Sequence, residues 1–384
     1  MLKKNLVISI YSPPEYYPPT LNAIEYLSGI YENIYVVFRN YDEQFDWTYP
    51  ENVHLIQTGK KIHVRKAEAA SVLKKVQYFI QYSRKLLKTV RRNQPDTILL
   101  YDYFPVLAYR LVSPFIRKPA TLWYHNHDVG DSKVIRKGSL SWAAWKSENW
   151  IFPRIQIFSL PSVDRQAYFP MEELKGRFFF LPNYPSVKVF NRYARYQKSY
   201  GEVLRIVYQG SIGPLHGLEE IIRLLGRSIR GKQMELIVRG FISEEYKKEL
   251  LGLAAESGVS KKLQIIPPGS YSKVIEQCMA YHIGIGIHRK DDIMNKTLGT
   301  SSNKIYEYAA AGLPVILYDN QQFRNYLGKY NWAFFTDCSE ASLISIFETI
   351  ERKIQILGNQ ARMDFENELN FEKYFAPVCQ LLNA

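Results

Sequence analysis

Short apolar runs alternate with longer amphipathic stretches along the first half of the chain. Runs rich in β-branched and aromatic residues predict strands, and apolar residues spaced three and four positions apart predict helices. The predicted strands of this half are residues 6–11, 34–38, 53–57, 97–101, 121–124, 155–160 and 178–181. Helices are predicted over residues 20–29 and about 66–92. Apolar strands that alternate with helices predict a parallel sheet covered on both faces.

The alternation stops near residue 185 and starts again near residue 204. Residues 191–201 are polar and lack apolar periodicity, which is typical of a linker. Further strands are predicted over 204–208, 234–238, 263–266, 283–287 and 315–318. The expected organisation is an N-terminal Rossmann-like domain (1–188), a linker (189–202), a C-terminal Rossmann-like domain (203–368) and a C-terminal helix (369–384). Whether that helix packs back on the N-terminal domain is left open.

Two such doubly wound domains, joined by a short linker, predict an α/β protein whose parallel sheets face each other across a cleft. Ligands bind at the carboxyl ends of the strands in open parallel sheets, because loops and helix N-termini meet there. Residues that directly follow a strand are therefore the first candidates for chemistry.

The composition excludes several classes of protein. Of the 384 residues, 46% are hydrophobic and 23% charged, which is typical of a globular chain and excludes wholesale disorder. Cys278, Cys338 and Cys379 are far apart in sequence, so a disulfide scaffold, a structural zinc site and a dithiol redox enzyme are not expected. No apolar run is long enough to span a bilayer, and the N-terminus lacks the features of a signal peptide. We expect a cytoplasmic location.

Positive charge is concentrated in one segment. The net charge is +13, and residues 60–92 carry eleven basic residues against Glu68, hence +10 of that excess. An apolar stripe over residues 69–90 predicts that this helix packs on the sheet. Three interpretations of the opposite face remain: a solvated surface, an anionic membrane surface at the inner face of the plasma membrane, or a nucleic-acid surface, for which no motif is found. The candidate membrane- or acceptor-facing residues are Lys74, Lys75, Arg84, Lys85 and Lys88.

The most informative stretch is residues 301–316. Serine and asparagine precede an alanine-rich run, and Gly312 and Pro314 follow it, which predicts a capped helix and then a strand. A helix N-terminus that carries Lys304 can bind a phosphate, because free N–H groups, the helix dipole and a full charge coincide there. Glu307 lies one turn further on, where a carboxylate can accept hydrogen bonds from a ribose diol. The alternative is an ordinary surface helix.

The same stretch, NKIYEYAAAGLPVI, resembles the nucleotide-sugar signature of GT-B glycosyltransferases, in particular the family-4 group of retaining enzymes (glycosyl transferases group 1). Other segments resemble the same family. The first strand, glycine loop and helix of its C-terminal domain are matched by residues 204–225, and its second strand and turn by residues 234–241. The histidine-bearing loop is matched by residues 124–128, and the strand before the interdomain hinge by residues 180–185. The resemblance implies a GT-B fold of two Rossmann-like domains.

The resemblance also implies residue roles. Glu307 matches the carboxylate that holds the donor ribose, and Lys304 matches a position near the donor diphosphate. The implied donor-binding residues are Gly210, Ser211, Gly213, His216, Arg239, Ser302, Asn303, Lys304 and Glu307. Two departures stand out. The family's basic residues of the first loop are replaced here by Ser211 or Ile212 and by His216, with Arg239 as a substitute source of charge. The glutamate expected eight positions before Glu307 is Gly299.

His127 follows the predicted strand 121–124, and the resemblance implies that it contacts the donor sugar or the reacting centre. The alternative is that His125 or His127 only caps the loop. Metal binding by these histidines and Asp128 is possible by ligand type, but no third ligand cluster is evident, so no metal is expected. The candidate catalytic residues are His127, Lys304 and Glu307, and no cofactor is expected beside a UDP- or GDP-linked sugar.

Residues 12–19 follow the first predicted strand and lack the GxGxxG fingerprint, which argues against a dinucleotide dehydrogenase. Their prolines and tyrosines suit a rigid wall for a sugar acceptor, or simply form a proline-rich turn.

The resemblance therefore implies a retaining, metal-independent hexosyltransferase that acts on a glycan or lipid-linked glycan acceptor in bacterial surface polysaccharide synthesis. Developing charge on the leaving diphosphate would be stabilised by the helix N-terminus and Lys304. Two alternatives remain open: a sugar-nucleotide epimerase of the same fold, and a non-catalytic, membrane-associated polysaccharide assembly protein.

Overall fold

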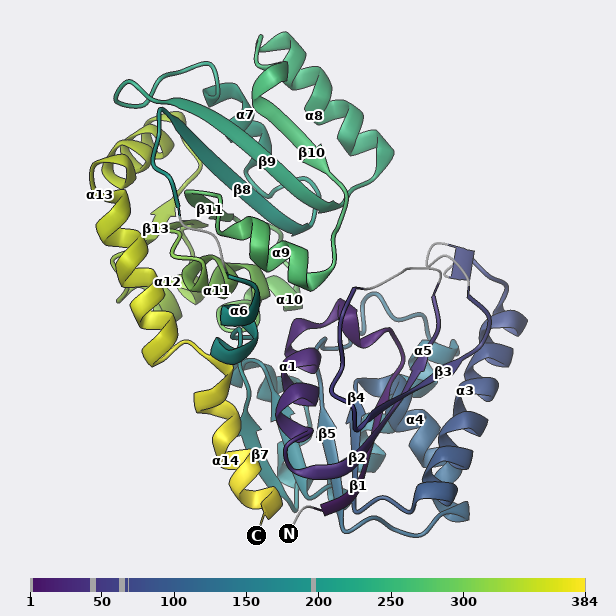
Figure 1. Ribbon diagram of the computed structural model, residues 1–384. Helices are drawn as coiled ribbons and strands as arrows, with labels where there is room; N and C mark the ends of the chain where they lie inside the picture. The colour runs from purple at the N-terminus through teal and green to yellow at the C-terminus, as the bar shows by residue number, and fades with distance from the viewer. Residues whose placement is uncertain (1–2, 42–45, 62–65, 68, 195–197, 384) are drawn as a thin grey trace. The chain divides into compact units, whose positions relative to one another are not determined.

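The computed structural model describes residues 3–41, 46–61, 66–67, 69–194 and 198–383 (Figure 1). The chain divides into two compact units. The first consists of Met1–Pro182 together with Tyr374–Ala384, and the second of Asn183–Lys373.

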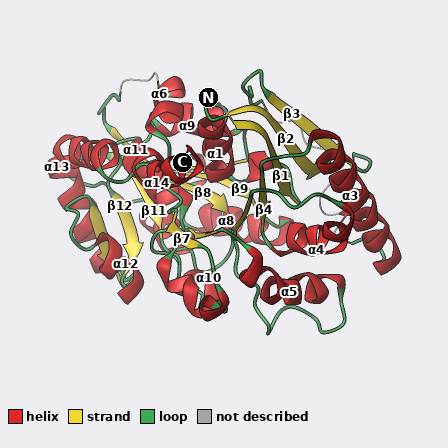
Figure 2. Ribbon diagram, turned by 90° about the horizontal axis from the view of Figure 1, so that it is seen from below, coloured by secondary structure: helices red, strands yellow, loops and turns green. Residues whose placement is uncertain are grey.

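The first unit is built on a seven-stranded parallel sheet with the order β3-β2-β1-β4-β5-β6-β7. The strands are β1 (Lys3–Ile10), β2 (Tyr31–Arg39), β3 (Val53–Thr58), β4 (Thr97–Tyr101), β5 (Thr121–His125), β6 (Ile157–Leu160) and β7 (Arg177–Phe180). Its longer helices are α1 (Pro18–Leu27), α3 (Val72–Asn93), α4 (Tyr103–Val112) and α5 (Leu140–Ile151). Helix α1 lies on one face of the sheet, and α3 and α4 lie on the other (Figure 2). Every residue of β4 is buried, as expected for a central strand covered on both faces.

The second unit is built on a six-stranded parallel sheet with the order β10-β9-β8-β11-β12-β13. The strands are β8 (Val203–Ser211), β9 (Gln233–Phe241), β10 (Leu263–Ile266), β11 (Ile283–Gly286), β12 (Val315–Tyr318) and β13 (Ala333–Thr336). The helices are α6 (Val187–Tyr193), α7 (Leu218–Leu224), α8 (Glu244–Glu256), α9 (Tyr271–Cys278), α10 (Ile293–Lys296), α11 (Asn303–Ala310), α12 (Gln321–Leu327), α13 (Glu340–Asn367) and α14 (Phe371–Asn383), the last of which runs on into the first unit. In both sheets the strand order reverses beside the first strand of the unit. This switch point lies between β1 and β4 in the first sheet and between β8 and β11 in the second, and ligands bind at such points in open parallel sheets.

The prediction of two doubly wound parallel sheets is confirmed, and each predicted strand overlaps an observed one. Strand β13 was not predicted. The polar stretch after residue 185 begins with helix α6, which Ser186 caps by accepting a hydrogen bond from the Val189 amide. Helix α14 places Phe375 in edge and tilted ring contacts with Tyr26 and Trp123, inside the first unit.

Helix α3 begins later than predicted, at Val72 rather than near residue 66, because Ser71 caps it. Residue 68 of the predicted helix lies outside the described residues. The prediction that its whole apolar stripe packs on the sheet is wrong for the first turns. Phe79, Leu86 and Val90 are buried, whereas Val72 and Leu73 are 75% and 74% exposed and Ile80 is 43% exposed. Among the described helices, none is long and apolar enough to cross a membrane.

Candidate functional site

The predicted phosphate-binding helix is observed as α11, and Lys304 lies in its first turn. Ser302 occupies the N-cap position but, among the described residues, its side chain forms no capping hydrogen bond. The expectation of a side-chain cap is therefore wrong at this residue. The Lys304 ammonium is half-buried, donates to the Tyr208 hydroxyl over 2.9 Å, and lies 4.0 Å from the centroid of the same ring. Tyr208 is near the carboxyl end of β8, so the helix tip and the strand end meet at this lysine.

Glu307 lies one turn further along α11 and is 6% exposed. Its Oε2 accepts a hydrogen bond of 2.6 Å from the side-chain amide of Gln209, the neighbour of Tyr208 on β8. The Gln209 amide nitrogen of the main chain in turn donates to the Tyr308 hydroxyl over 2.9 Å. Two consecutive residues of one strand thus hold Lys304 and Glu307 at the carboxyl edge of the second sheet.

Burial shifts the pKa values of Lys304 and Glu307 in opposite directions, because it disfavours the charged form of each. Burial lowers the pKa of Lys304 to about 7, and the nearby Glu307 carboxylate only partly offsets that shift. Burial raises the pKa of Glu307 to about 7, against the hydrogen bond from Gln209 and the charge of Lys304. A bound anion beside Lys304 would restore its charge, whereas hydrogen-bond donors at Glu307 would favour the carboxylate. A ligand that carries both an anion and hydroxyl groups would therefore change the protonation of Lys304 and of Glu307.

Two facing glycines leave the main chain open beside Lys304. Gly210 of β8 and Gly240 of β9 are paired in register and adopt φ values of 120° and 144°. A Cβ atom on Gly240 would lie 1.7 Å from the Gly210 carbonyl oxygen, so no side chain fits there. A Cβ on Gly210 would lie 3.6 Å from the Lys304 Nζ. Glycine at 210 thus keeps the space next to the ammonium free for a ligand.

His216 and His288 lie on the other side of Tyr208. The His216 Nδ1 is 2.8 Å from the Tyr208 hydroxyl and 3.3 Å from the Gly213 amide nitrogen, which donates to it. Burial, then the charge of Lys304, lowers the pKa of His216 to about 3, so this histidine is neutral at physiological pH. His216, which stands where the family has a basic residue, therefore brings no positive charge to this loop.

His288 was not predicted, although it directly follows the predicted strand 283–287. Its ring lies 4.8 Å from that of His216, and its Nε2 is buried without a partner in the part of the chain that the structure describes. Asn303 contributes a second such atom, Oδ1. Buried polar atoms without a partner are uncommon in proteins, so these two mark the surroundings of the α11 tip as a candidate polar site.

Arg239 and Gly299 bear on the two departures from the family pattern, which are the missing basic residues of the first loop and the missing glutamate. Arg239 is 5% exposed and donates to Gln277 of α9, while its Nε is buried without a hydrogen-bond partner among the described residues. At Gly299, a Cβ atom would lie 2.3 Å from the ring of Tyr326, and the Gly299 amide donates to Gln322 over 3.3 Å. The packing of α12 therefore leaves no room for a glutamate at this position.

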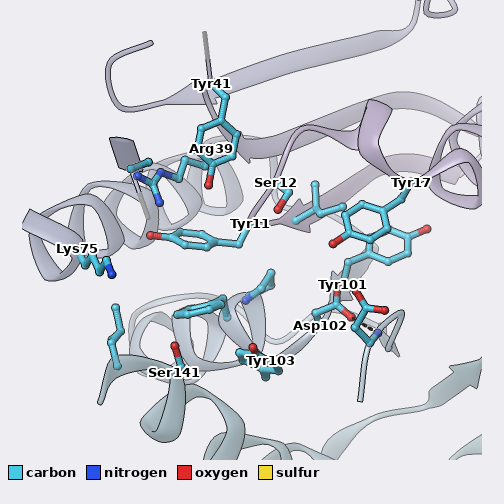
Figure 3. Close-up of a pocket in the computed structure, with 16 residues that line it drawn as sticks. Tyr11, Ser12, Tyr17, Arg39, Tyr41, Lys75, Tyr101, Asp102, Tyr103 and Ser141 are labelled. Carbon is cyan, nitrogen blue, oxygen red and sulfur yellow. Dashed lines mark hydrogen bonds between the residues drawn. The ribbon is translucent and has the colours of Figure 1, made fainter. Parts of the chain in front are cut away.

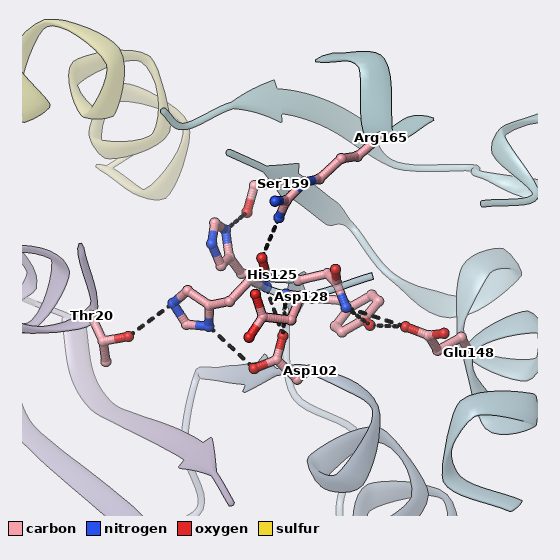
Figure 4. A network of polar contacts seen from close by, with 10 residues as sticks. Thr20, Asp102, His125, Asp128, Glu148, Ser159 and Arg165 are labelled. Atoms are coloured by element: carbon pink, nitrogen blue, oxygen red, sulfur yellow. Dashed lines mark hydrogen bonds and ion pairs between the residues drawn. The ribbon is translucent and has the colours of Figure 1, made fainter. Parts of the chain in front are cut away.

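In the first unit, the His127 ring is buried and held by contacts on its faces and at both nitrogens. It is 3% exposed, and its ring is stacked between Tyr17 and Tyr101 at centroid distances of 4.4 and 4.7 Å. Its Nδ1 donates to Asp102 over 3.2 Å, and its Nε2 lies 3.1 Å from the Thr20 hydroxyl (Figure 4). Because both ring nitrogens are occupied, His127 positions its neighbours in this structure, and a catalytic role for it remains a prediction.

Asp102 is the residue that the sequence analysis missed at this edge. It directly follows β4, has a φ of 63°, and its Oδ1 accepts from the main-chain amides of His127 (2.6 Å) and Asp128 (3.4 Å). A non-glycine residue at positive φ is strained, and such strain is concentrated at functional sites. The rule that strand ends carry chemistry, applied to the predicted strand 97–101, would have found it.

Behind Asp102 lies a buried polar network (Figure 4). The Tyr124 hydroxyl donates to Glu148, whose pKa burial raises to about 8, and His125 Nδ1 lies 2.8 Å from the Ser159 hydroxyl. Arg165 donates to the His127 carbonyl oxygen. Within the described residues, no group of three or more histidine, cysteine or acidic side chains is arranged to hold a metal ion. The network instead fixes the 124–128 loop.

Asp102 also lines a cavity of about 350 Å³ at the carboxyl ends of β1, β2, β4 and β5 (Figure 3). Six of its 16 lining residues are tyrosine or phenylalanine. The lining residues are Ile10, Tyr11, Ser12, Tyr17, Arg39, Tyr41, Ala67, Lys75, Tyr101, Asp102, Tyr103, Phe104, Pro105, Asp128, Leu140 and Ser141. Ser12 and Tyr17 come from residues 12–19, which were considered as a wall for a sugar acceptor, and Tyr11 was predicted as the last residue of the strand before them. Lys75 is the one predicted acceptor residue that lines this cavity.

No family model and no curated protein matches the sequence. Solved structures do match. Sucrose-phosphate synthase from Thermosynechococcus elongatus is similar with a TM-score of 0.68 at 10% identity, over 99% of this chain and 98% of that chain. HepE of Anabaena in complex with UDP gives 0.65 at 12% identity, over 100% of both chains. WaaG, a glycosyltransferase involved in lipopolysaccharide biosynthesis, gives 0.61 at 12% identity, over 99% of this chain and 100% of that one. The chain has the GT-B fold.

Proposed function

We propose that this protein is a glycosyltransferase that takes its sugar from a nucleoside-diphosphate sugar. The observation that carries the proposal is the single turn of α11 that presents Lys304 and Glu307 beside the open main chain of Gly210. An ammonium next to an uncapped helix N-terminus suits a diphosphate, and a carboxylate one turn away suits the two hydroxyls of a ribose. The similarity of the fold to HepE in complex with UDP supports a nucleotide ligand.

The same groups supply the chemistry. When the bond between the sugar and the diphosphate breaks, negative charge grows on the leaving phosphate. Lys304 and the amide groups of the first turn of α11 are fixed before the reaction, so they stabilise that charge without reorganising. On this basis we propose transfer that does not depend on a metal ion. We further propose retention at the anomeric carbon, as the resemblance to family-4 enzymes implies.

The test is acceptor-dependent release of nucleoside diphosphate. A thermal-shift screen against UDP-, GDP- and CMP-sugars first identifies the donor, because a ligand that binds only the native state raises the melting temperature. The donor is then incubated with and without mixed glycan and lipid-linked acceptors. We expect nucleoside diphosphate to appear with an acceptor. Isomerised sugar from the donor alone would show an epimerase, and absence of any donor binding would favour an assembly role.

For the acceptor, we propose a glycan or lipid-linked glycan of a bacterial surface polysaccharide, reached at an anionic membrane. Helix α3 supports this part of the proposal. Lys74, Arg84, Lys85 and Lys88 are exposed, and Val72 and Leu73 are exposed next to Lys74 at the start of the helix. Basic side chains near an anionic leaflet contribute about 1 kcal/mol each, and exposed apolar side chains can enter the interface.

Vesicle flotation tests the membrane proposal. We expect the protein to float with vesicles that contain phosphatidylserine and not with pure phosphatidylcholine, and binding to fall when salt is raised. The variant Arg84→Gln/Lys85→Gln/Lys88→Gln should lose most of the binding. Lys247→Gln/Lys248→Gln/Lys261→Gln, which removes the same charge from the second unit, is the matched control. Equal loss in both triple variants would show that net charge alone is responsible.

A further inference from the structure

The cavity of the first unit has opposite charges at its two ends. The cavity is lined by four charged residues, Arg39, Lys75, Asp102 and Asp128. Arg39 and Lys75 lie toward one end and Asp102 toward the other (Figure 3), and the main-chain amide of Asp128 donates to Asp102 over 3.4 Å. Figure 3 shows Tyr11 between Arg39 and Asp102, so the two ends are separated by an aromatic ring rather than paired with each other. A ligand that fills the cavity meets cations and carboxylates in different places.

Arg39 is held in place by aromatic rings. Its guanidinium carbon lies 4.7 Å from the centroid of Tyr78, 5.0 Å from that of Tyr41 and 5.6 Å from that of Tyr11. Over the residues that the structure describes, no carboxylate forms an ion pair with Arg39 or Lys75. A guanidinium oriented by rings, without a carboxylate partner, is suited to bind a carboxylate or phosphate from a ligand.

The opposite end offers acceptors. A carboxylate has about four acceptor positions, and the contacts of Asp102 with His127 and the Asp128 amide occupy three, so one remains for a ligand hydroxyl. The walls between the ends include Tyr11, which is stacked on Phe104 at 4.7 Å. Aromatic faces of this kind pack against the C–H faces of sugar rings. The cavity volume of about 350 Å³ is within the range of small-molecule sites.

We propose that this cavity binds a carbohydrate that carries an anionic group. The carboxylate or phosphate of the ligand lies at Arg39 and Lys75, its ring lies against Tyr11, and a hydroxyl donates to Asp102. That this carbohydrate is part of the acceptor rests on the proposed function, whereas the binding itself does not. The proposal therefore deepens the function by assigning a substrate class to the acceptor.

Binding is measured on the full chain without nucleotide, by calorimetry or ligand-observed NMR, with three probes: glucuronate, glucose 1-phosphate and glucose. We expect at least one anionic probe to bind about tenfold or more tightly than glucose, a difference of about 1.4 kcal/mol. Preference for glucuronate would indicate an acidic sugar, and preference for glucose 1-phosphate would indicate a phosphorylated one. Equal affinity for all three probes would overturn the proposal.

Two variants locate the site. Lys75→Gln removes a half-buried charge from the cavity, and Lys74→Gln removes an exposed charge from the adjacent position of α3 as the matched control. We expect Lys75→Gln and Arg39→Gln to abolish most of the anionic preference and Lys74→Gln to leave it intact. Lys75→Gln keeps the test decisive if Arg39→Gln fails to fold. An anionic preference that survives both substitutions would contradict the proposed site.

Saturating UDP separates this inference from the proposed function. UDP should not displace the anionic probe, and Lys75→Gln should bind UDP as the wild type does. Competition between UDP and the probe would overturn the cavity as a separate carbohydrate site. Failure of the wild type to bind any nucleotide, with the anionic preference intact, would count against the proposed function alone.

Discussion

The two units place their candidate sites at the same part of the same architecture, yet they assemble them differently. In the second unit, Lys304 and Glu307 are carried by one helical turn and are held by two consecutive residues of β8. In the first unit, Arg39, Lys75 and Asp102 come from three separate elements. In the second site the ammonium and the carboxylate lie within one helical turn, whereas the first site has its cations and its carboxylates at different places in the cavity. A contiguous motif can be recognised in a sequence, but a dispersed one requires the fold.

Substitution of Lys304 should give the largest difference between the two units, because it should lower turnover without changing carbohydrate binding in the first unit. We expect Lys304→Ala to lower turnover by about 100- to 1,000-fold, since loss of one fixed donor at a developing charge costs about 2.7–4 kcal/mol. Anionic carbohydrate binding in the first unit should not change. Steady-state kinetics on a defined donor checks the first effect. The control is Lys248→Ala, an exposed lysine of α8, and equal losses in both variants would contradict the role of Lys304.

Neutralising Glu307 should affect the donor less. Glu307→Gln keeps the size of the side chain but weakens the acceptor for the ribose hydroxyls. Hydrogen bonds to charged groups contribute about 1.5–3 kcal/mol, so donor affinity should fall by roughly 10- to 150-fold. Calorimetry with UDP-sugar and with a 2′-deoxy analogue tests the assignment: the variant should no longer distinguish the two. Glu249→Gln, on the exposed side of α8, should behave as the wild type.

Gly299→Glu would place the family's glutamate at its expected position in the second unit. We expect destabilisation of about 1–3 kcal/mol from overpacking, because the new Cβ would lie 2.3 Å from the Tyr326 ring. Chemical denaturation gives the change in the free energy of unfolding. Gly252→Ala is the matched control, because no atom lies within 4 Å of a Cβ there, and it should stabilise helix α8 by about 0.5–1 kcal/mol. A stable Gly299→Glu protein would contradict the packing argument.

Asp102→Asn tests the first unit by itself. Asparagine has nearly the same shape as aspartate, so the main chain should be retained while the charge is lost. We expect the free energy of unfolding to fall by about 1 kcal/mol, because the bond from the His127 ring is weakened. UDP affinity should not change, whereas glucose and glucuronate should both bind more weakly in ligand-observed NMR. Weaker UDP binding with unchanged sugar binding would reverse the assignment of the two regions.

Proton exchange on donor binding gives the smallest but most specific signal. A diphosphate should raise the pKa of Lys304 from about 7, so at pH 8 binding takes up protons. Ribose hydroxyls should lower the pKa of Glu307 from about 7, so at pH 6 binding releases protons. Calorimetry in buffers of different ionisation enthalpy should show this change of sign. A nucleoside-diphosphate sugar is suitable because its phosphates do not titrate near neutrality. Uptake at both pH values would exclude the Glu307 contact.

The sequence was sufficient for most of the fold. Apolar strands such as β4 are continuous runs bounded by turn residues, and the periodicity of α11 ends at Gly312, which has a φ of 66°. Strand β13 was missed because its four residues, Ala333–Thr336, carry no alternation and are recognisable only when paired with β12. The exposed first turns of α3 were missed because an apolar stripe does not reveal where the underlying sheet ends.

The candidate sites were predictable to different degrees. Lys304 and Glu307 lie in one motif, whereas His288 and Asp102 had no signal beyond their place after a strand. The neutrality of His216 and the engagement of Arg239 by Gln277 depend on burial and on α9, which the local sequence does not contain. The opposed charges in the cavity of the first unit could not be predicted, because Arg39, Lys75 and Asp102 come from β2, α3 and the end of β4. The sequence does not show that these elements meet at one cavity.

The most direct test of the central claim is a crystal structure of the protein with a bound nucleoside-diphosphate sugar. The account predicts the diphosphate within hydrogen-bonding distance of Lys304 Nζ and of the amides that open α11, with both ribose hydroxyls on the carboxylate of Glu307. A nucleotide bound elsewhere on the chain, with this helical turn vacant, would contradict it.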